Sequence, residues 1–128
     1  MKKWEERKKN YNLKNTLSSS KDLERLKNPT DGYMDEVHEW RYPCSADLVA
    51  LLVAEMEPGI ARLGYLLTNK NGSPSLGFST TRVSSASGYT FIRELGHNMG
   101  NHHSRNQASN PAPETGGLFE YSTGWRWT

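Results

Sequence analysis

The sequence has a single cysteine, Cys44, and no run of apolar residues as long as a membrane span. One thiol excludes an internal disulfide, and a helix needs about 18–20 apolar residues to cross a bilayer. Net charge is also scarce, since 16 Lys and Arg stand against 14 Asp and Glu and leave +2. This balance predicts neither a nucleic acid nor a membrane surface as the partner.

The beginning of the chain is charged but lacks the apolar stretch of a secretion signal. It reads MKKWEERKKNYNLK, in which Glu5 and Glu6 dilute the basic residues. A length of 128 residues suits a single domain. We predict that residues 1–16 form a charged N-terminal tail and that residues 17–128 form the domain. The compartment of the protein is left unknown by this sequence.

The apolar pattern after the tail predicts a short helix. Leu23 and Leu26 share one helix face, Ser19 and Asp22 approximate a capping box, and Pro29 stops the helix.

A second helix is predicted from the next apolar stripe. Tyr33, Val37 and Trp40 follow helical spacing, with an N-cap at residue 30 or 31 and an end at Pro43. Such a stripe must pack on another element.

Three apolar segments then have the character of strands. Residues 47–53 (DLVALLV) form an unbroken apolar run, which predicts a central strand covered on both faces. Residues 63–68 and 76–83 are further strand candidates, separated by the turn formers NKNGSP.

A third helix is predicted to begin near Gly88, capped by a serine at position 85 or 87, and to end at Gly100 in the left-handed conformation. Its apolar stripe is expected to point inward: Ile92, Leu95 and Met99. Residues 101–117 are predicted as loop and residues 118–127 as a terminal strand or hairpin. The order of elements predicts an α/β (α+β) domain whose last helix packs against the sheet.

The third helix carries an incomplete zinc-binding pattern. Residues 93–103 read RELGHNMGNHH, one residue away from H-E-x-x-H-x-x-G-x-x-H. In that pattern two histidines one helical turn apart converge on zinc, a glycine reverses the backbone, and a third histidine completes the ligands. Here the first position is Arg93. A guanidinium has no lone pair and stays protonated, so it cannot bind zinc and its charge repels the ion.

The other histidines are poor substitutes for the missing ligand. His102 adjoins His103 and should point away from it, and His38 lies on the earlier helix. Three explanations for Arg93 stay open: drift in an unselected copy, a reading error in the sequence, or a selected role. In a selected role it would pair with Glu94 or anchor a peptide carboxylate, although adjacent helix positions do not face each other.

The segment ELGHNMGNHHS resembles the site helix of metzincin metalloproteases, specifically the adamalysin or reprolysin-like branch, which typically reads H-E-[LI]-G-H-N-x-G-x-x-H-[DS]. Upstream, NPTDGYMDEVHEWR, ADLVALLV and LGYLL look like the helix, central strand and edge strand of bacterial reprolysin-like domains. Downstream, GLFEYSTGWR resembles the segment that follows the site. The likeness covers roughly residues 20–126. It implies a partial metzincin-like fold, a small mixed sheet with an active-site helix packed against it.

The resemblance implies a zinc-dependent metalloendopeptidase that hydrolyses peptide bonds with a zinc-activated water. His97 and His103 would be the metal ligands and Glu94 the general base. The partner would be a peptide or protein substrate bound along the edge strand near Leu63–Leu67.

Three departures limit what the resemblance implies. Arg93 stands at the first ligand position, and we expect zinc to bind weakly or not at all. The loss of this ligand should weaken the free energy of zinc binding by at least ~3–4 kcal/mol. The methionine-bearing turn and the first strand and helix of such domains are not evident, so we expect a partial domain. The function is therefore an impaired or inactive metalloendopeptidase, or alternatively a non-catalytic peptide-binding module or a non-functional fragment.

Overall fold

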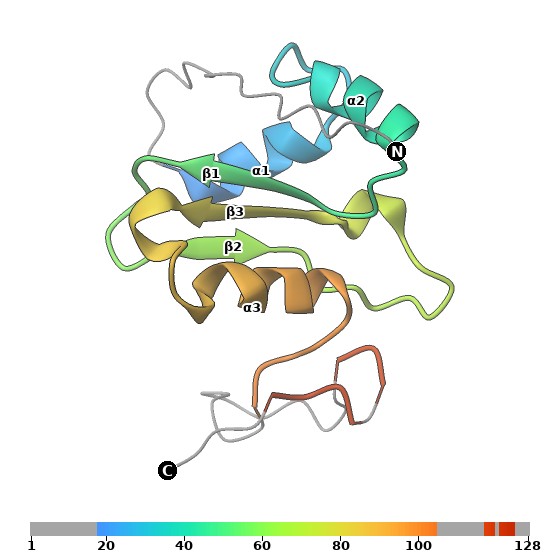
Figure 1. Ribbon diagram of the computed structural model, residues 1–128, viewed down its shortest axis with the longest axis vertical. Helices are drawn as coiled ribbons and strands as arrows, with labels where there is room; N and C mark the ends of the chain where they lie inside the picture. The colour runs from blue at the N-terminus through green and yellow to red at the C-terminus, as the bar shows by residue number, and fades with distance from the viewer. Residues whose placement is uncertain (1–17, 105–116, 120, 125–128) are drawn as a thin grey trace, which may run out of the picture.

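The computed structural model describes residues 18–104, 117–119 and 121–124, so the predicted tail lies outside the described residues. Its helices and strands follow in chain order: α1 (Ser19–Lys27), α2 (Glu36–Cys44), β1 (Val49–Val53), β2 (Arg62–Gly64), β3 (Phe78–Arg82) and α3 (Tyr89–Asn98). Two single 3-10 turns flank β3. Figure 1 shows the sheet between α1 and α3. The predicted α/β fold, a small mixed sheet with the last helix packed against it, is confirmed.

The centre of the sheet is β3, in the strand order β1-β3-β2. β1 runs parallel to β3 with Val49 opposite Phe78, and β2 runs antiparallel with Leu63 opposite Thr80. The prediction that residues 47–53 form the central strand is therefore wrong within the described part of the chain. An unbroken apolar run fits a half-covered strand as well, and Leu52 on the uncovered face is 53% exposed.

The edge strand is shorter than its apolar pattern predicts. Residues 63–68 were expected to be extended, but only Arg62–Gly64 form ladder pairs. The chain beyond Gly64 leaves the sheet gradually, because Tyr65 still donates to the Phe78 carbonyl and Leu67 donates to the His97 carbonyl on α3. β2 is nevertheless an edge strand, as the sequence predicted.

The core lies between the sheet and α1. Leu23 and Leu26, the predicted apolar face of α1, are buried together with Met34 and Phe78. Each such side chain contributes about 1.5–3 kcal/mol by leaving water. Around this centre lie partly buried apolar residues from α2, from β1, from β2 and from the position just after β2: Val37, Val49, Leu51, Leu63 and Tyr65.

The first turn of α1 is capped by a distant side chain. The predicted capping box at Ser19 is absent: Ser18 is the N-cap and makes no side-chain cap bond. Instead, the Ser19 amide donates to both carboxylate oxygens of Glu57, at 2.9 and 2.8 Å, and the Ser19 hydroxyl donates to Glu57 Oε2. The loop after β1 thereby holds α1 in place.

α2 begins later than its apolar stripe predicts. The residues before it form a turn in which Met34 has a positive φ of 59°, so the helix starts at Glu36 with Asp35 as N-cap. Tyr33 precedes the helix and is exposed. Pro43 lies inside the last turn, one residue short of the end, and Ser45 closes the helix in the left-handed region.

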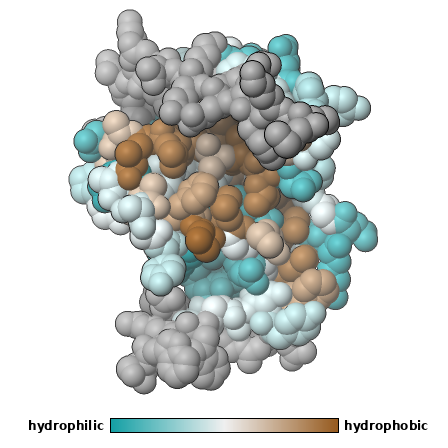
Figure 2. Space-filling view, viewed as in Figure 1, coloured by the Kyte–Doolittle hydropathy of each residue, from teal (hydrophilic) through white to brown (hydrophobic). Residues whose placement is uncertain are grey.

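α3 turns a polar face toward the sheet, contrary to the prediction. Glu94 and Asn98 are buried, whereas Ile92 and Met99 are 66% and 63% exposed. The expected start near Gly88 is confirmed with Gly88 as N-cap, but neither serine caps it by a side chain. Figure 2 shows apolar side chains gathered across the middle of one face of the molecule.

Of the segments predicted as loop and terminal strand, only part is described. His102 and Thr123 form an isolated parallel bridge between them. Across the described residues, no helix has the length and apolar character required to traverse a bilayer.

Candidate functional site

Asn98 fixes the position of α3 on the sheet. Its side-chain amide lies 2.9 Å from the carbonyls of Tyr65 and Leu76 and 3.0 Å from that of Phe78. These carbonyls belong to the segments that leave β2 and enter β3. One buried amide therefore binds the helix to both strands, one residue after His97.

Glu94 is placed against the edge strand one turn before Asn98. A methyl group at Gly64 would lie 3.0 Å from Glu94 Oε2, so the glycine allows the helix to approach β2 this closely. Glu94 is only 4% exposed. Burial raises the pKa of Glu94, and the neighbouring side chains of His97, Arg62 and Arg93 oppose that shift.

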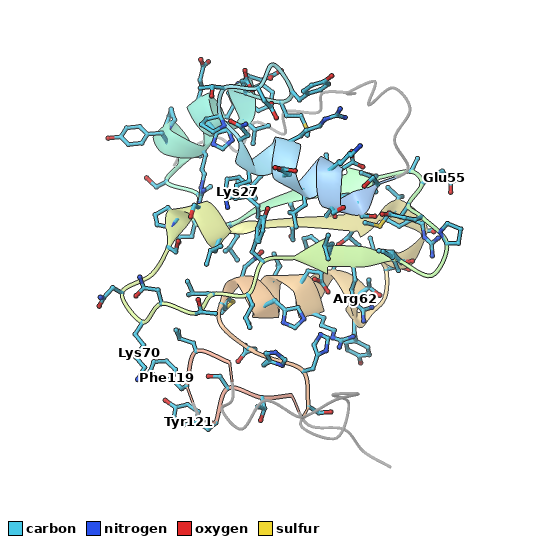
Figure 3. The ribbon with its side chains drawn as sticks, turned by 180° about the vertical axis from the view of Figure 1, so that it is seen from behind. Lys27, Glu55, Arg62, Lys70, Phe119 and Tyr121 are labelled. Atoms are coloured by element: carbon cyan, nitrogen blue, oxygen red, sulfur yellow. The ribbon has the colours of Figure 1, made fainter. Side chains whose placement is uncertain are left out.

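Arg62 on β2 is the ion-pair partner of Glu94. Its Nε lies 2.9 Å from Glu94 Oε1, and its Nη1 is 3.5 Å from the Thr90 hydroxyl. Figure 3 shows Arg62 on β2, on the side where α3 packs. The guanidinium thus contacts two residues one turn apart on the same helix. The carboxylate that the family resemblance assigns as a general base is engaged in this pair.

His97 and His103 turn their rings toward each other. Their Nε2 atoms are 3.1 Å apart, and the ring centroids are 4.8 Å apart. Two nitrogens bound to one tetrahedral zinc at about 2.0–2.1 Å would be separated by about 3.3 Å. The two predicted ligands are therefore brought together at a spacing that one metal ion can bridge.

The tautomer of His97 follows from its other ring nitrogen. Nδ1 lies 2.6 Å from the Asn101 carbonyl, which only accepts, so Nδ1 carries the proton. His97 Nε2 then keeps its lone pair and accepts from His103 Nε2. A backbone carbonyl behind a metal-binding histidine orients the ring in the same way in zinc sites.

His103 has the most strongly shifted acid–base equilibrium of the site. The residue as a whole is exposed, but its ring faces that of His97, and desolvation lowers the pKa of His103 to about 4. The positive charge of Arg93 is the next largest cause. His103 is therefore neutral at pH 7.

The loop that carries His103 is held by the segment after it. Gly100 takes a φ of +91°, which ends α3 in the left-handed conformation as predicted. Leu118 donates to the Gly100 carbonyl at 2.7 Å, and the His102 amide donates to Ser122 at 2.8 Å. The Gly124 amide in turn donates to the His102 carbonyl at 2.9 Å. These bonds fix the backbone on both sides of the loop.

Arg93 lies beside the two histidines rather than away from them. It lines the same pocket as Glu94, His97 and His103. Burial lowers the pKa of Arg93, the charge of Arg62 lowers it further, and Glu94 opposes both. The substitution thus places a partly buried positive charge where the zinc pattern requires a lone pair.

The other two histidines do not complete the set. His102 Nδ1 accepts from the His103 amide at 2.8 Å, which occupies that nitrogen. His38 lies under α1, with Nε2 3.0 Å from the Leu26 carbonyl and its ring 5.4 Å from that of Phe78.

Two imidazoles fit a zinc ion here, but the donor set as a whole does not. Among the described residues, no group of three or more His, Cys, Asp or Glu side chains is arranged to hold a metal ion. Glu94 is turned to Arg62, and Arg93 offers only donors and a positive charge. A catalytic zinc site requires three protein ligands.

Sequence reasoning missed two residues of this site. Only one feature of the sequence could have indicated Arg62 as a site residue, namely that it is the charged residue next to the predicted edge strand. Asn98 was visible as part of the motif, but the pattern gave no hint that its amide reaches three carbonyls. The catalytic role of Glu94 and the ligand roles of His97 and His103 stay predictions.

Comparison with known proteins shows the family to which the chain belongs. The family described as Metallo-peptidase family M12B Reprolysin-like matches residues 6–104, most of the chain and all of the site up to His103. No curated protein and no solved structure gives a significant match. The chain belongs to the reprolysin-like metallopeptidases, a family that is zinc-dependent in general.

Proposed function

We propose that this chain is a metallopeptidase-type domain that holds a peptide along β2 and whose zinc site Arg93 impairs, so that hydrolysis is weak or lost. One observation carries the proposal: the Nε2 atoms of His97 and His103 are 3.1 Å apart, yet the residue one turn before His97 is an arginine. A two-ligand site beside a cation holds zinc weakly.

The free edge of β2 supports the peptide-binding half of the proposal. The Ala61 carbonyl and the Tyr65 amide bond to β3. In an antiparallel ladder the alternate residues point their amides and carbonyls the other way. Arg62 and Gly64 therefore offer their main-chain groups to a further strand, beside the pocket that contains the histidines. An extended peptide binds such an edge by strand addition.

A metal titration of three chains tests the impaired zinc site. Native mass spectrometry at micromolar zinc should give less than one ion per chain for the natural sequence. Arg93→His should raise zinc affinity by about a hundredfold or more, because it supplies a third imidazole and removes a charge. Arg93→Gln is the matched control, since it removes the charge without adding a ligand, and should give only a small gain. Equal zinc affinity for all three chains would overturn the ligand assignment.

A second candidate function is a peptide-binding module without catalysis. The ion pair between Arg62 and Glu94 favours it, because a carboxylate held by a guanidinium is a poor proton acceptor. Titration of an extended peptide in the presence of a chelator separates the two candidates. Binding that survives chelation supports the module, and binding that is lost on chelation supports the metal site.

A further inference from the structure

The pocket between β2 and α3 has the wrong charge for a cation. It has a volume of about 340 Å³ and contains two guanidiniums, from Arg62 and Arg93, against the single carboxylate of Glu94. One positive charge is therefore in excess. A partly enclosed excess charge of this kind is stabilised by an anion.

The two guanidiniums have different roles in the pocket. Arg62 is engaged, with Nε on Glu94 and Nη1 near Thr90. For Arg93, no hydrogen bond from the guanidinium to another residue of the described part of the chain is present, although it lines the pocket. Its donors are thus available to a bound molecule. A planar guanidinium matches a carboxylate with two parallel hydrogen bonds.

The open edge of β2 points to the kind of carboxylate. Arg62 and Gly64, whose outward main-chain groups have no partner in the described part of the chain, border the same pocket and suit an extended peptide backbone. A neutral peptide carbonyl at Arg93 would leave the excess charge uncompensated, whereas a terminal carboxylate would neutralise it.

We propose that this pocket binds the free C-terminal carboxylate of a peptide, with Arg93 as the anchoring residue and the edge of β2 holding the preceding residues. The inference rests on the proposed peptide binding at β2 and deepens it. A metalloendopeptidase places a metal beside an internal peptide bond, whereas in this proposal the chain presents a guanidinium to a peptide terminus. The specificity that follows is for a terminus instead of a sequence in the middle of a protein.

Fluorescence anisotropy with one N-terminally labelled peptide in two forms tests this inference. The full chain is titrated in the presence of EDTA with the peptide ending in a free acid and with the same peptide ending in an amide. We expect the acid to bind about tenfold more tightly or better, the scale of a charge-assisted hydrogen-bonded pair. An amidated peptide with an added internal aspartate, and inorganic phosphate as a competitor, report whether any anion suffices.

Two variants connect the preference to Arg93. Arg93→Gln should reduce the ratio of acid to amide affinity to about one. Lys21→Gln makes the same change in net charge on the exposed side of α1 and should keep the ratio. A preference that survives in Arg93→Gln would overturn the assignment of the anchor. Competition on the natural chain by an N-acetylated amino acid against its amide needs no variant and covers a failure of Arg93→Gln to fold.

The outcomes separate this inference from the proposed function. Equal binding of acid and amide refutes the carboxylate pocket but leaves peptide binding at β2 intact. Binding of neither form refutes both. The site would be a general anion site if the internal aspartate raised the affinity of the amidated peptide as much as the free acid does. Displacement of the free-acid peptide by phosphate would have the same meaning. In either case the terminal-carboxylate proposal would fail.

Discussion

Two arginines, thirty-one positions apart in the sequence, line the same pocket as the carboxylate of Glu94. Glu94 is not paired with its neighbour Arg93, because adjacent helix positions diverge, but with Arg62 from the strand opposite. Among the described residues, Glu94 is therefore engaged in an ion pair with Arg62 and not with Arg93. The stability of the fold and the chemistry of the site are therefore coupled through one ion pair.

Removing Arg62 should destabilise the fold in a pH-dependent way. Arg62→Gln leaves the buried Glu94 without its counter-charge, which we expect to cost about 2 kcal/mol at pH 7. This is less than for a fully buried pair, because Arg62 is 30% exposed. The pKa of Glu94, already raised by burial, should rise further. A carboxyl with a raised folded pKa stabilises the fold below its unfolded pKa and loses that contribution as pH rises through the folded value.

The destabilisation by Arg62→Gln should therefore be larger at about pH 8 than at about pH 5, as measured by urea unfolding. Adding Glu94→Gln to the variant should remove most of this pH dependence. An equal loss of stability at both pH values would contradict the uncompensated charge as its cause.

At the scale of an element, α3 is held by polar contacts rather than by its apolar stripe. Asn98→Ala should cost about 2 kcal/mol, because it removes the side-chain amide that bonds to the carbonyls of Tyr65, Leu76 and Phe78. Ile92→Ala on the exposed side of the same helix should cost about 0.5 kcal/mol or less. Thermal or urea unfolding of both variants measures the difference. A larger loss for Ile92→Ala would mean that the helix packs by its apolar face after all.

The start of α1 should depend on the ionisation of Glu57. Hydrogen bonds from Ser19, its hydroxyl above all, lower the pKa of Glu57. A carboxyl with a lowered folded pKa stabilises the fold above its unfolded pKa, near 4.5, and loses that contribution as pH falls through the folded value. Glu57→Gln should lower the melting temperature at neutral pH, and the difference should vanish in acid. Glu55→Gln, the same change two residues earlier at an exposed position, is the control and should have little effect.

These elements also show how far sequence patterns reach. The helices and strands were predicted from apolar spacing, and the site motif located the helix that carries His97. The buried face of α3 was not predicted. Apolar spacing identifies the stripe of Ile92, Leu95 and Met99, but it does not show which side of the helix packs against the sheet. The run in β1 was likewise consistent with a central or an edge strand. The Arg62–Glu94 pair required knowledge of which strand lies opposite α3, which no local pattern contains.

At the scale of the whole molecule, the site depends on a segment beyond the family match. That match ends at residue 104, yet Leu118, Ser122 and Gly124 bond to the backbone of Gly100 and His102. The contact is close, since a methyl group added at Gly100 would clash with Leu118 Cβ. We infer that this packing keeps His103 facing His97.

Gly100→Ala should therefore disturb both stability and the histidine pair. Gly72 provides a matched control, because its φ of +82° is also left-handed but a methyl group there would meet nothing within 4 Å. Gly72→Ala should cost about 1–2 kcal/mol from backbone strain alone. Gly100→Ala should cost more, because Leu118 must also move, and it should change the imidazole NMR signals of His97 and His103, which Gly72→Ala should leave unaltered. Equal losses of stability with unchanged imidazole signals would show that residues 117–124 do not position His103.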